Sequence, residues 1–219
     1  PPSKTDKSRI SESDVKKGVR LACQSAVNSD LTVRIPQESR HKQHVILTEG
    51  LDIRNRIKAL VHARGENAPA KYGAAFDIGT TTIVGVLMNL KTGHRLAVAS
   101  RMNPQAAHGA DVISRINFTI MEKEGLSILH SLVIRSVNEM LVELCGKAAI
   151  KRESISKITA VGNTTMQHLL LNVSPASLGA IPFKPAVKNS VSARAKEKGI
   201  GIHPDGTLYV FPNIAGFVG

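Results

Sequence analysis

The sequence predicts an α/β domain whose mixed sheet contains a three-stranded antiparallel meander and is flanked by helices. Two apolar runs, Gly73–Ile78 and Ile83–Asn89, are separated by a short polar turn, which is typical of neighbouring strands. An apolar stripe at helical spacing follows between Leu126 and Ala149. A further apolar run, Ile158–Val161, leads directly into the helical segment Met166–Leu171. Strands followed by helix, strand and helix favour this class of fold.

The meander and the long helix carry the strongest patterns. The turn Lys91–Gly93 connects the second run to a third predicted strand, Arg95–Ser100. The helix has one apolar face, which we expect to enter the core. That face consists of Leu129, Leu132, Val133, Val137, Met140, Leu141, Leu144 and Cys145.

The residues before this domain predict a small α+β segment and a linker. Residues 1–22 are polar, with a short helical pattern from Ser13 to Leu21. Short strands are expected at 31–35 and 45–48, and a helix at 53–63. Residues 62–71 contain Gly and Pro among polar residues, which is typical of a linker.

Composition excludes several classes of function. The formal net charge is +12, but Lys and Arg are scattered and aromatic residues make up only 3%, which argues against nucleic-acid binding and favours an acidic protein partner. No apolar run reaches the roughly 18 residues that a membrane span needs. The chain has two distant cysteines, too few for a disulfide framework. We therefore expect a cytoplasmic protein without a membrane partner.

The segment with the most chemical meaning lies between the first two strands. Asp77 ends a buried run, and Gly79, Thr80, Thr81 and Thr82 follow it. Glycine permits close backbone approach to a phosphate, and the threonines supply amide and hydroxyl donors. The carboxylate of Asp77 can hold Mg²⁺ through water, and metal with donors supplies what phosphoryl transfer requires. The alternative is an ordinary hairpin with a polar tip.

This string resembles the first phosphate motif of the superfamily of actin, heat-shock ATPases and sugar kinases. Further stretches narrow the resemblance to the ATPase domain of the reductive activators of corrinoid proteins, the RACo family. These stretches are Asn103–Gln105, Gly109–Ile116, Ala160–Met166, His168–Leu171, Leu178–Gly179, Pro182–Pro185 and Pro212–Gly219. The resemblance implies that residues 73–219 form the first lobe of an actin-like, ribonuclease H-like ATPase domain that binds ATP and Mg²⁺.

The resemblance also assigns the N-terminal part of the chain. Residues 1–30 resemble the end of a ferredoxin-like domain, and residues 31–72 a linker with a shortened middle region. Cys23 matches the last cysteine of a 2Fe–2S cluster, which would form only in the full-length protein because four thiolates are needed. The alternative for Cys23 is a small buried residue. We expect Cys145 to be core.

Other candidate residues follow two predicted strands. Gly162, Asn163, Thr164 and Thr165 open a helix, where they could offer donors to a phosphate or simply cap the helix. Asp111 is a candidate catalytic carboxylate or a helix cap. Asn103 and Gln105 are further candidate nucleotide ligands.

The resemblance implies ATP-dependent reductive activation of a corrinoid protein, from Co(II) to Co(I). Electrons would enter from a donor through the ferredoxin domain, and a homodimer is possible. No second Asp-x-Gly-Thr string occurs in the sequence. We therefore expect this chain to be an incomplete piece that hydrolyses ATP negligibly alone. The alternatives are a small-molecule kinase, for which only Asp111 offers a base, and a non-catalytic binding module.

Overall fold

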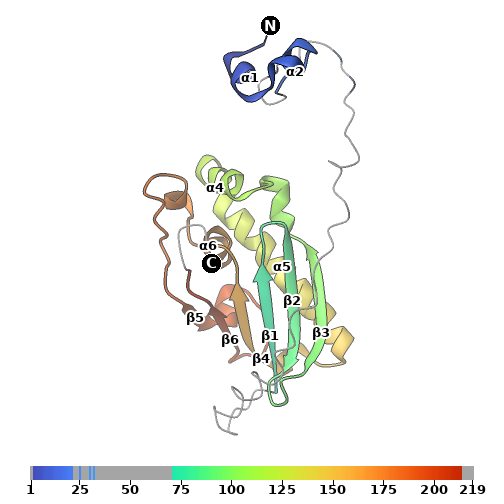
Figure 1. Ribbon diagram of the computed structural model, residues 1–219. Helices are drawn as coiled ribbons and strands as arrows, with labels where there is room; N and C mark the ends of the chain where they lie inside the picture. Colours follow the sequence, from blue (N-terminus) through green and yellow to red (C-terminus); the bar gives the residue numbers. More distant parts are fainter. Residues whose placement is uncertain (1, 22–24, 26–29, 31, 33–70, 214–219) are drawn as a thin grey trace. The chain divides into compact units, whose positions relative to one another are not determined.

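The computed structural model describes residues 2–21, 25, 30, 32 and 71–213 (Figure 1). The chain divides into two compact units, residues 1–45 and 46–219, each of which is described by itself. The strands and helix expected within residues 31–63, the linker at 62–71 and the terminal stretch 214–219 lie wholly or almost wholly outside the described residues.

The first unit contains two short helices, α1 (Lys4–Arg9) and α2 (Glu12–Lys16). Ser3 caps α1 in a capping box with Asp6, whose carboxylate also accepts a hydrogen bond from the Leu21 amide at 2.9 Å. This bond lowers the pKa of Asp6. The helix is shorter than the Ser13–Leu21 pattern predicts, because Gly18 adopts a φ of 91° that an α-helix cannot contain.

The second unit is built on a six-stranded mixed sheet in the order β3-β2-β1-β4-β6-β5. β1, β2 and β3 form the antiparallel meander, and β4 and β6 run parallel to β1 on its other side. The mixed sheet with flanking helices confirms the predicted fold. The strands are β1 (Tyr72–Ile78), β2 (Thr82–Asn89), β3 (Arg95–Met102), β4 (Ile155–Val161), β5 (Val191–Arg194) and β6 (Thr207–Val210).

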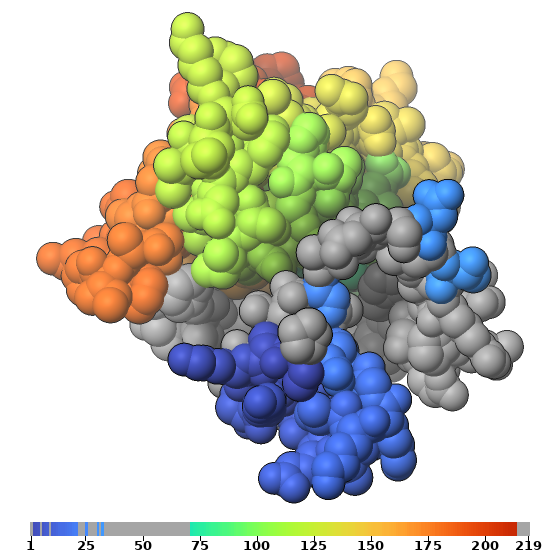
Figure 2. Space-filling view, turned by 90° about the horizontal axis from the view of Figure 1, so that it is seen from above, coloured from blue at the N-terminus to red at the C-terminus, as the bar shows by residue number. Residues whose placement is uncertain are grey.

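Helices α5 (Gly125–Ala148) and α6 (Thr164–Leu171) pack on each other and on one face of the sheet (Figure 1). The predicted stripe of α5 is buried except for Leu132, which is half-buried, and Cys145 lies in the core as expected. Between β3 and α5 lie the 3₁₀ helix η3 (Pro104–His108) and α4 (Val112–Met121). α4 lies beside the segment that follows α6, shown in yellow-green and orange in Figure 2.

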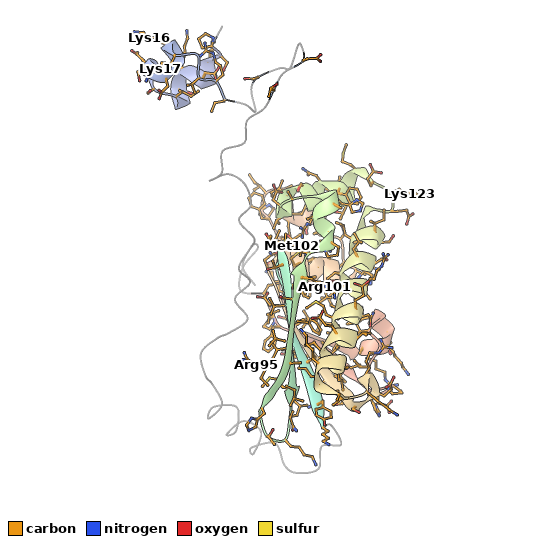
Figure 3. The ribbon with its side chains drawn as sticks, turned by 90° about the vertical axis from the view of Figure 1, so that its right-hand side faces the viewer. Lys16, Lys17, Arg95, Arg101, Met102 and Lys123 are labelled. Carbon is orange, nitrogen blue, oxygen red and sulfur yellow. The ribbon has the colours of Figure 1, made fainter. Side chains whose placement is uncertain are left out.

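Residue choice within the meander follows from cross-strand packing. Phe76 faces Gly85 on β2, and a Cβ at Gly85 would lie 2.7 Å from a ring carbon of Phe76. Glycine therefore leaves the space that the aromatic ring fills. Arg101 on β3, labelled in Figure 3, forms ion pairs with Glu139 and Glu143 of α5, so it connects the outer strand to the helix.

Candidate functional site

The turn of the β1–β2 hairpin forms the tip of the candidate site. Ile78 and Ile83 are the last facing pair, and residues 79–81 lie between the end of β1 and the start of β2. A Cβ on Gly79 would lie 2.4 Å from the carbonyl oxygen of Thr82, so this tight turn requires glycine. The antiparallel pairing and the place of Gly79 confirm the predicted hairpin. Its contact with phosphates stays a prediction.

The turn that follows β4 lies beside this tip. β1 and β4 are parallel, with Asp77 opposite Val161, so the carboxyl ends of both strands meet at one edge of the sheet. A Cβ on Gly162 would lie 2.7 Å from the carbonyl oxygen of Ile78. Glycine at this position therefore allows the two turns to approach closely.

Asn163 connects the two turns. It is the N-cap of α6, where its side-chain oxygen accepts a hydrogen bond from the Met166 amide at 3.1 Å. Its side-chain nitrogen donates to the hydroxyl of Thr80 at 2.8 Å. Asn163 can thus cap α6 and contribute to the candidate site at the same time. Thr164 and Thr165, which were predicted beside it as ligands, have fully buried side chains.

The three carbonyls of the hairpin turn are all bound from within the protein. The side chain of Asn103 donates to the Gly79 oxygen at 2.8 Å, and its backbone amide donates to the Thr81 oxygen at 2.8 Å. The guanidinium of Arg115 donates to the Thr80 oxygen at 2.7 Å. The turn is therefore fixed by residues that follow it in the chain by more than twenty positions.

The amides of this turn consequently point the other way. In a trans peptide the N–H is directed opposite to the C=O of the same plane. The carbonyls of Gly79 and Thr80 share their peptide planes with the amides of Thr80 and Thr81. In the part of the chain that the structure describes, neither amide donates a hydrogen bond. Successive free N–H groups of this kind form an anion-binding concavity.

Asn103 and Gln105, predicted as nucleotide ligands, lie beneath the turn. Both are buried, with 1% and 0% of their surface exposed. Asn103 caps η3 by accepting from the Gln105 amide at 3.0 Å, and the Gln105 side chain donates to the Leu129 oxygen at 2.9 Å. Asn103 thus supports the turn directly and Gln105 does so only through Arg115, and a role of either as a nucleotide ligand stays a prediction.

Arg115 is the residue of the site that sequence reasoning missed. It lies in α4 and is completely buried, although its motif had been noticed as part of a resemblance. Its side chain donates to the oxygens of Gly109 at 2.9 Å, Gln105 at 3.2 Å and Thr80 at 2.7 Å, and to the sulfur of Met166 at 3.2 Å. Burial lowers the pKa of Arg115 to about 10, so it stays protonated at neutral pH.

The carboxylate of Asp77 stands on the exposed side of β1. It forms no hydrogen bond or ion pair with any residue that the structure describes. Loss of hydration beside neighbouring strands nevertheless raises its pKa. An acidic oxygen donor without a protein partner at this edge fits a divalent cation, held directly or through water.

Asp111 has a different environment. It is the N-cap of α4, and its carboxylate accepts from the amide of Ser114 at 2.7 Å and from the Ser114 hydroxyl at 2.9 Å. These hydrogen bonds, with the backbone bond as the largest cause, lower the pKa of Asp111. The structure thus shows the capping alternative, and a catalytic role for Asp111 stays a prediction.

The remaining site predictions concern metals and clusters. Cys23 lies outside the described residues. Among the residues that are described, no three His, Cys, Asp or Glu side chains gather as a metal site. No helix in the described ranges is both long and apolar enough to cross a membrane.

Comparisons with known proteins agree on one kind of relative. A family model described as the RACo middle region matches residues 72–219. The corrinoid activation enzyme RamQ of Eubacterium limosum is 35% identical over 182 residues, which cover 83% of this chain and 30% of RamQ. The solved structure of a reductive activator for corrinoid, iron–sulfur protein matches with a TM-score of 0.67 and 36% identity, over 71% of this chain and 25% of that one. The chain therefore spans less than a third of the length of these relatives.

Proposed function

We propose, from the premise that this chain belongs to the RACo family, that its β1–β2 turn binds the phosphates of ATP. The observation that carries the proposal is the orientation of the turn, whose carbonyls are bound within the protein and whose Thr80 and Thr81 amides are free in the described structure. Backbone amides of this kind recognise the charge of a phosphate and act without reorganisation.

Asp77 completes the proposed phosphate site. Mg²⁺ would be held by its carboxylate, directly or through water, and would neutralise charge on the phosphates. The hydroxyl oxygen of Thr80 accepts from Asn163 of the second turn, so the Thr80 hydroxyl hydrogen would be directed to the same ligand. The chain would in this way supply one wall of a nucleotide site.

In the whole protein we propose that ATP drives the reductive activation of a corrinoid protein, from Co(II) to Co(I). RamQ is a corrinoid activation enzyme, and the matched solved structure is a reductive activator for corrinoid, iron–sulfur protein. Electrons would enter through a ferredoxin-like 2Fe–2S domain to which Cys23 would contribute. We place this activity in the cytoplasm.

One observation favours this function over the kinase alternative. A kinase requires a base close to the γ-phosphate that can accept a proton from the substrate. Asp111 is the only such candidate from sequence, and its carboxylate is engaged by Ser114 at 2.7 Å. Hydrogen bonds to the ionised form also lower its pKa, which makes it a weaker base.

The phosphate proposal is tested by calorimetric titration of this chain with MgATP, MgADP and adenosine. We expect affinity to rise with phosphate number and to depend on Mg²⁺ in wild type but not in Asp77→Asn. Asn89→Ala, at the opposite turn of the meander, is the matched control and should bind like wild type. Equal affinity for adenosine and MgATP would refute the phosphate site.

The activity of the whole protein needs the full-length chain. We expect MgATP and a low-potential donor to convert a Co(II) corrinoid protein to Co(I), followed by its optical spectrum. An unchanged spectrum with active wild-type protein would contradict the proposal. This chain alone should hydrolyse ATP negligibly, because efficient phosphoryl transfer needs donors on both sides of the nucleotide.

A further inference from the structure

Arg115 is a buried cation without a carboxylate partner. Its exposed fraction is 0%, and within the described ranges it forms no ion pair. Its four hydrogen-bond acceptors are the Thr80, Gly109 and Gln105 oxygens and the Met166 sulfur, all of them neutral. Four of the five guanidinium N–H groups thus have an acceptor, whereas no contacting group carries a negative charge.

A charge in this state is costly unless something compensates it. Removing an ion from water carries a penalty that neutral hydrogen-bond acceptors repay only in part. Asp111, one helical turn earlier, attracts Arg115, but its carboxylate is exposed and bound to Ser114. The structure therefore retains a positive charge directly below the hairpin turn.

Through its contact with the Thr80 carbonyl, the charge of Arg115 acts on a peptide group whose N–H lies on the exposed side of the turn. The Thr80 carbonyl, 2.7 Å from the guanidinium, belongs to the same peptide group as the Thr81 amide. A charged donor on the carbonyl polarises the peptide and strengthens its N–H as a donor. The Gly109 carbonyl accepts from the Arg115 Nε at 2.9 Å, and the lack of a side chain at Gly109 leaves room for the Arg115 stem, because a Cβ there would lie 2.8 Å from its Cγ.

We propose that Arg115 is a positioning residue for phosphate binding, which holds the Thr80 carbonyl inward, directs the Thr81 amide to the ligand and finds its counter-charge in the bound phosphates. This inference rests on the proposed function. It also specifies the ligand feature that Arg115 recognises, which is the charge of a polyphosphate and not the base or the sugar.

The test compares three ligands by calorimetric titration of this chain: MgATP, inorganic triphosphate and adenosine. We expect Arg115→Met to weaken MgATP and triphosphate by about tenfold or more, the effect of losing a charged hydrogen-bond donor. Any affinity for adenosine should stay unchanged. Arg115→Lys keeps the charge but not the planar fork, and should recover part of the loss.

A second variant neutralises the charge of Arg115 with a neighbouring carboxylate and keeps the arginine itself. Gln105→Glu would place a carboxylate where the Gln105 oxygen now lies, 3.2 Å from the guanidinium. The resulting ion pair should weaken triphosphate binding, although the bond from Arg115 to Thr80 stays. Gln105→Met is the matched control, because it also loses the bond to the Leu129 oxygen but adds no charge.

The outcomes separate this inference from the function on which it rests. Circular dichroism and thermal melting identify variants that fail to fold, and Arg115→Lys and Gln105→Glu then carry the test. If wild type binds no triphosphate and no MgATP, both proposals fall. If wild type binds both, and a folded Arg115→Met and Gln105→Glu bind them equally well, only the role of Arg115 is refuted.

Discussion

The two turns of the meander lie at opposite ends of the same strands and are stabilised in different ways (Figure 1). The β2–β3 turn is local: Asn89 accepts from the amides of Lys91 and Thr92 at 2.9 and 3.2 Å, and Gly93 adopts a φ of 72°. The β1–β2 turn instead depends on Asn103 and Arg115 from later elements.

The difference shows what each turn can do. A turn that satisfies its amides with its own side chain has no donors left for a ligand. A turn whose carbonyls are bound from beneath keeps its amides free, at the cost of relying on distant residues. The long-range support of the β1–β2 turn thus leaves its amides available for the proposed binding site, and each supporting residue can be substituted separately.

The largest effect is expected from Asn103→Ala. The Gly79 oxygen would lose its donor and η3 its cap in a buried setting, so the free energy of unfolding should fall by about 2–3 kcal/mol. MgATP affinity should fall with it, because the turn loses its inward anchor. Chemical denaturation and titration measure the two effects. If a folded Asn103→Ala variant bound MgATP as tightly as wild type, the hydrogen bonds from Asn103 to the turn would not be needed for binding.

Gly162→Ala tests the approach of the second turn. The added Cβ would lie 2.7 Å from the Ile78 carbonyl oxygen, and overpacking of this kind costs about 1–3 kcal/mol. Gly146→Ala, in the exposed part of α5 where nothing lies within 4 Å, should instead stabilise by about 0.5–1 kcal/mol. Melting temperatures that shift in the same direction would contradict this contrast.

Asp77→Asn should have opposite effects on stability and on binding. The folded-state pKa of Asp77 is raised, so the folded protein binds that proton more tightly than the unfolded chain. Stability from this group is therefore present at pH below the unfolded value and is lost as pH rises through the folded pKa. The neutral variant should melt slightly higher than wild type at pH 7, and the difference should disappear in acid.

Asp77→Asn should weaken Mg²⁺-dependent ATP binding by about 10–100-fold, the usual loss of metal affinity when a residue that binds the metal's own ligands, such as its waters, is substituted. Titration with and without Mg²⁺ measures this. A lower melting temperature at pH 7 together with unchanged Mg²⁺ dependence would show that Asp77 is a structural residue.

The smallest effect is expected at the far turn. Asn89→Ala removes two local hydrogen bonds at an exposed position, and should cost about 0.5–1 kcal/mol. MgATP affinity should not change, since this turn and the β1–β2 turn lie at opposite ends of β2 (Figure 1). A loss of affinity comparable to that of Asn103→Ala would remove the distinction between the two turns.

Sequence reasoning predicted those features whose signals are local. The meander and α5 follow from apolar patterns, and the hairpin from a glycine between two apolar runs. β5 and β6 were missed because each has only four residues and is defined by its pairing within the sheet. Such strands have too little pattern to be distinguished from a loop.

The candidate site was predicted less completely, for a physical reason. Polar residues near a predicted turn were assigned to the ligand, whereas Asn103 and Gln105 are directed into the protein. Arg115, in contrast, was not assigned to the site at all. Arginine is rarely buried, so sequence alone favours a surface position. Only the three-dimensional arrangement shows the carbonyls that hold it.

The inward binding of the three carbonyls has a mechanical consequence. A loop already held in a single geometry has little conformational entropy to lose when a ligand arrives. By the same argument it has little freedom to respond when ATP becomes ADP. We therefore expect the β1–β2 turn to keep its shape through a nucleotide cycle, as a fixed reference surface. If ATP binds here as proposed, we expect any movement that accompanies binding to arise outside the β1–β2 turn.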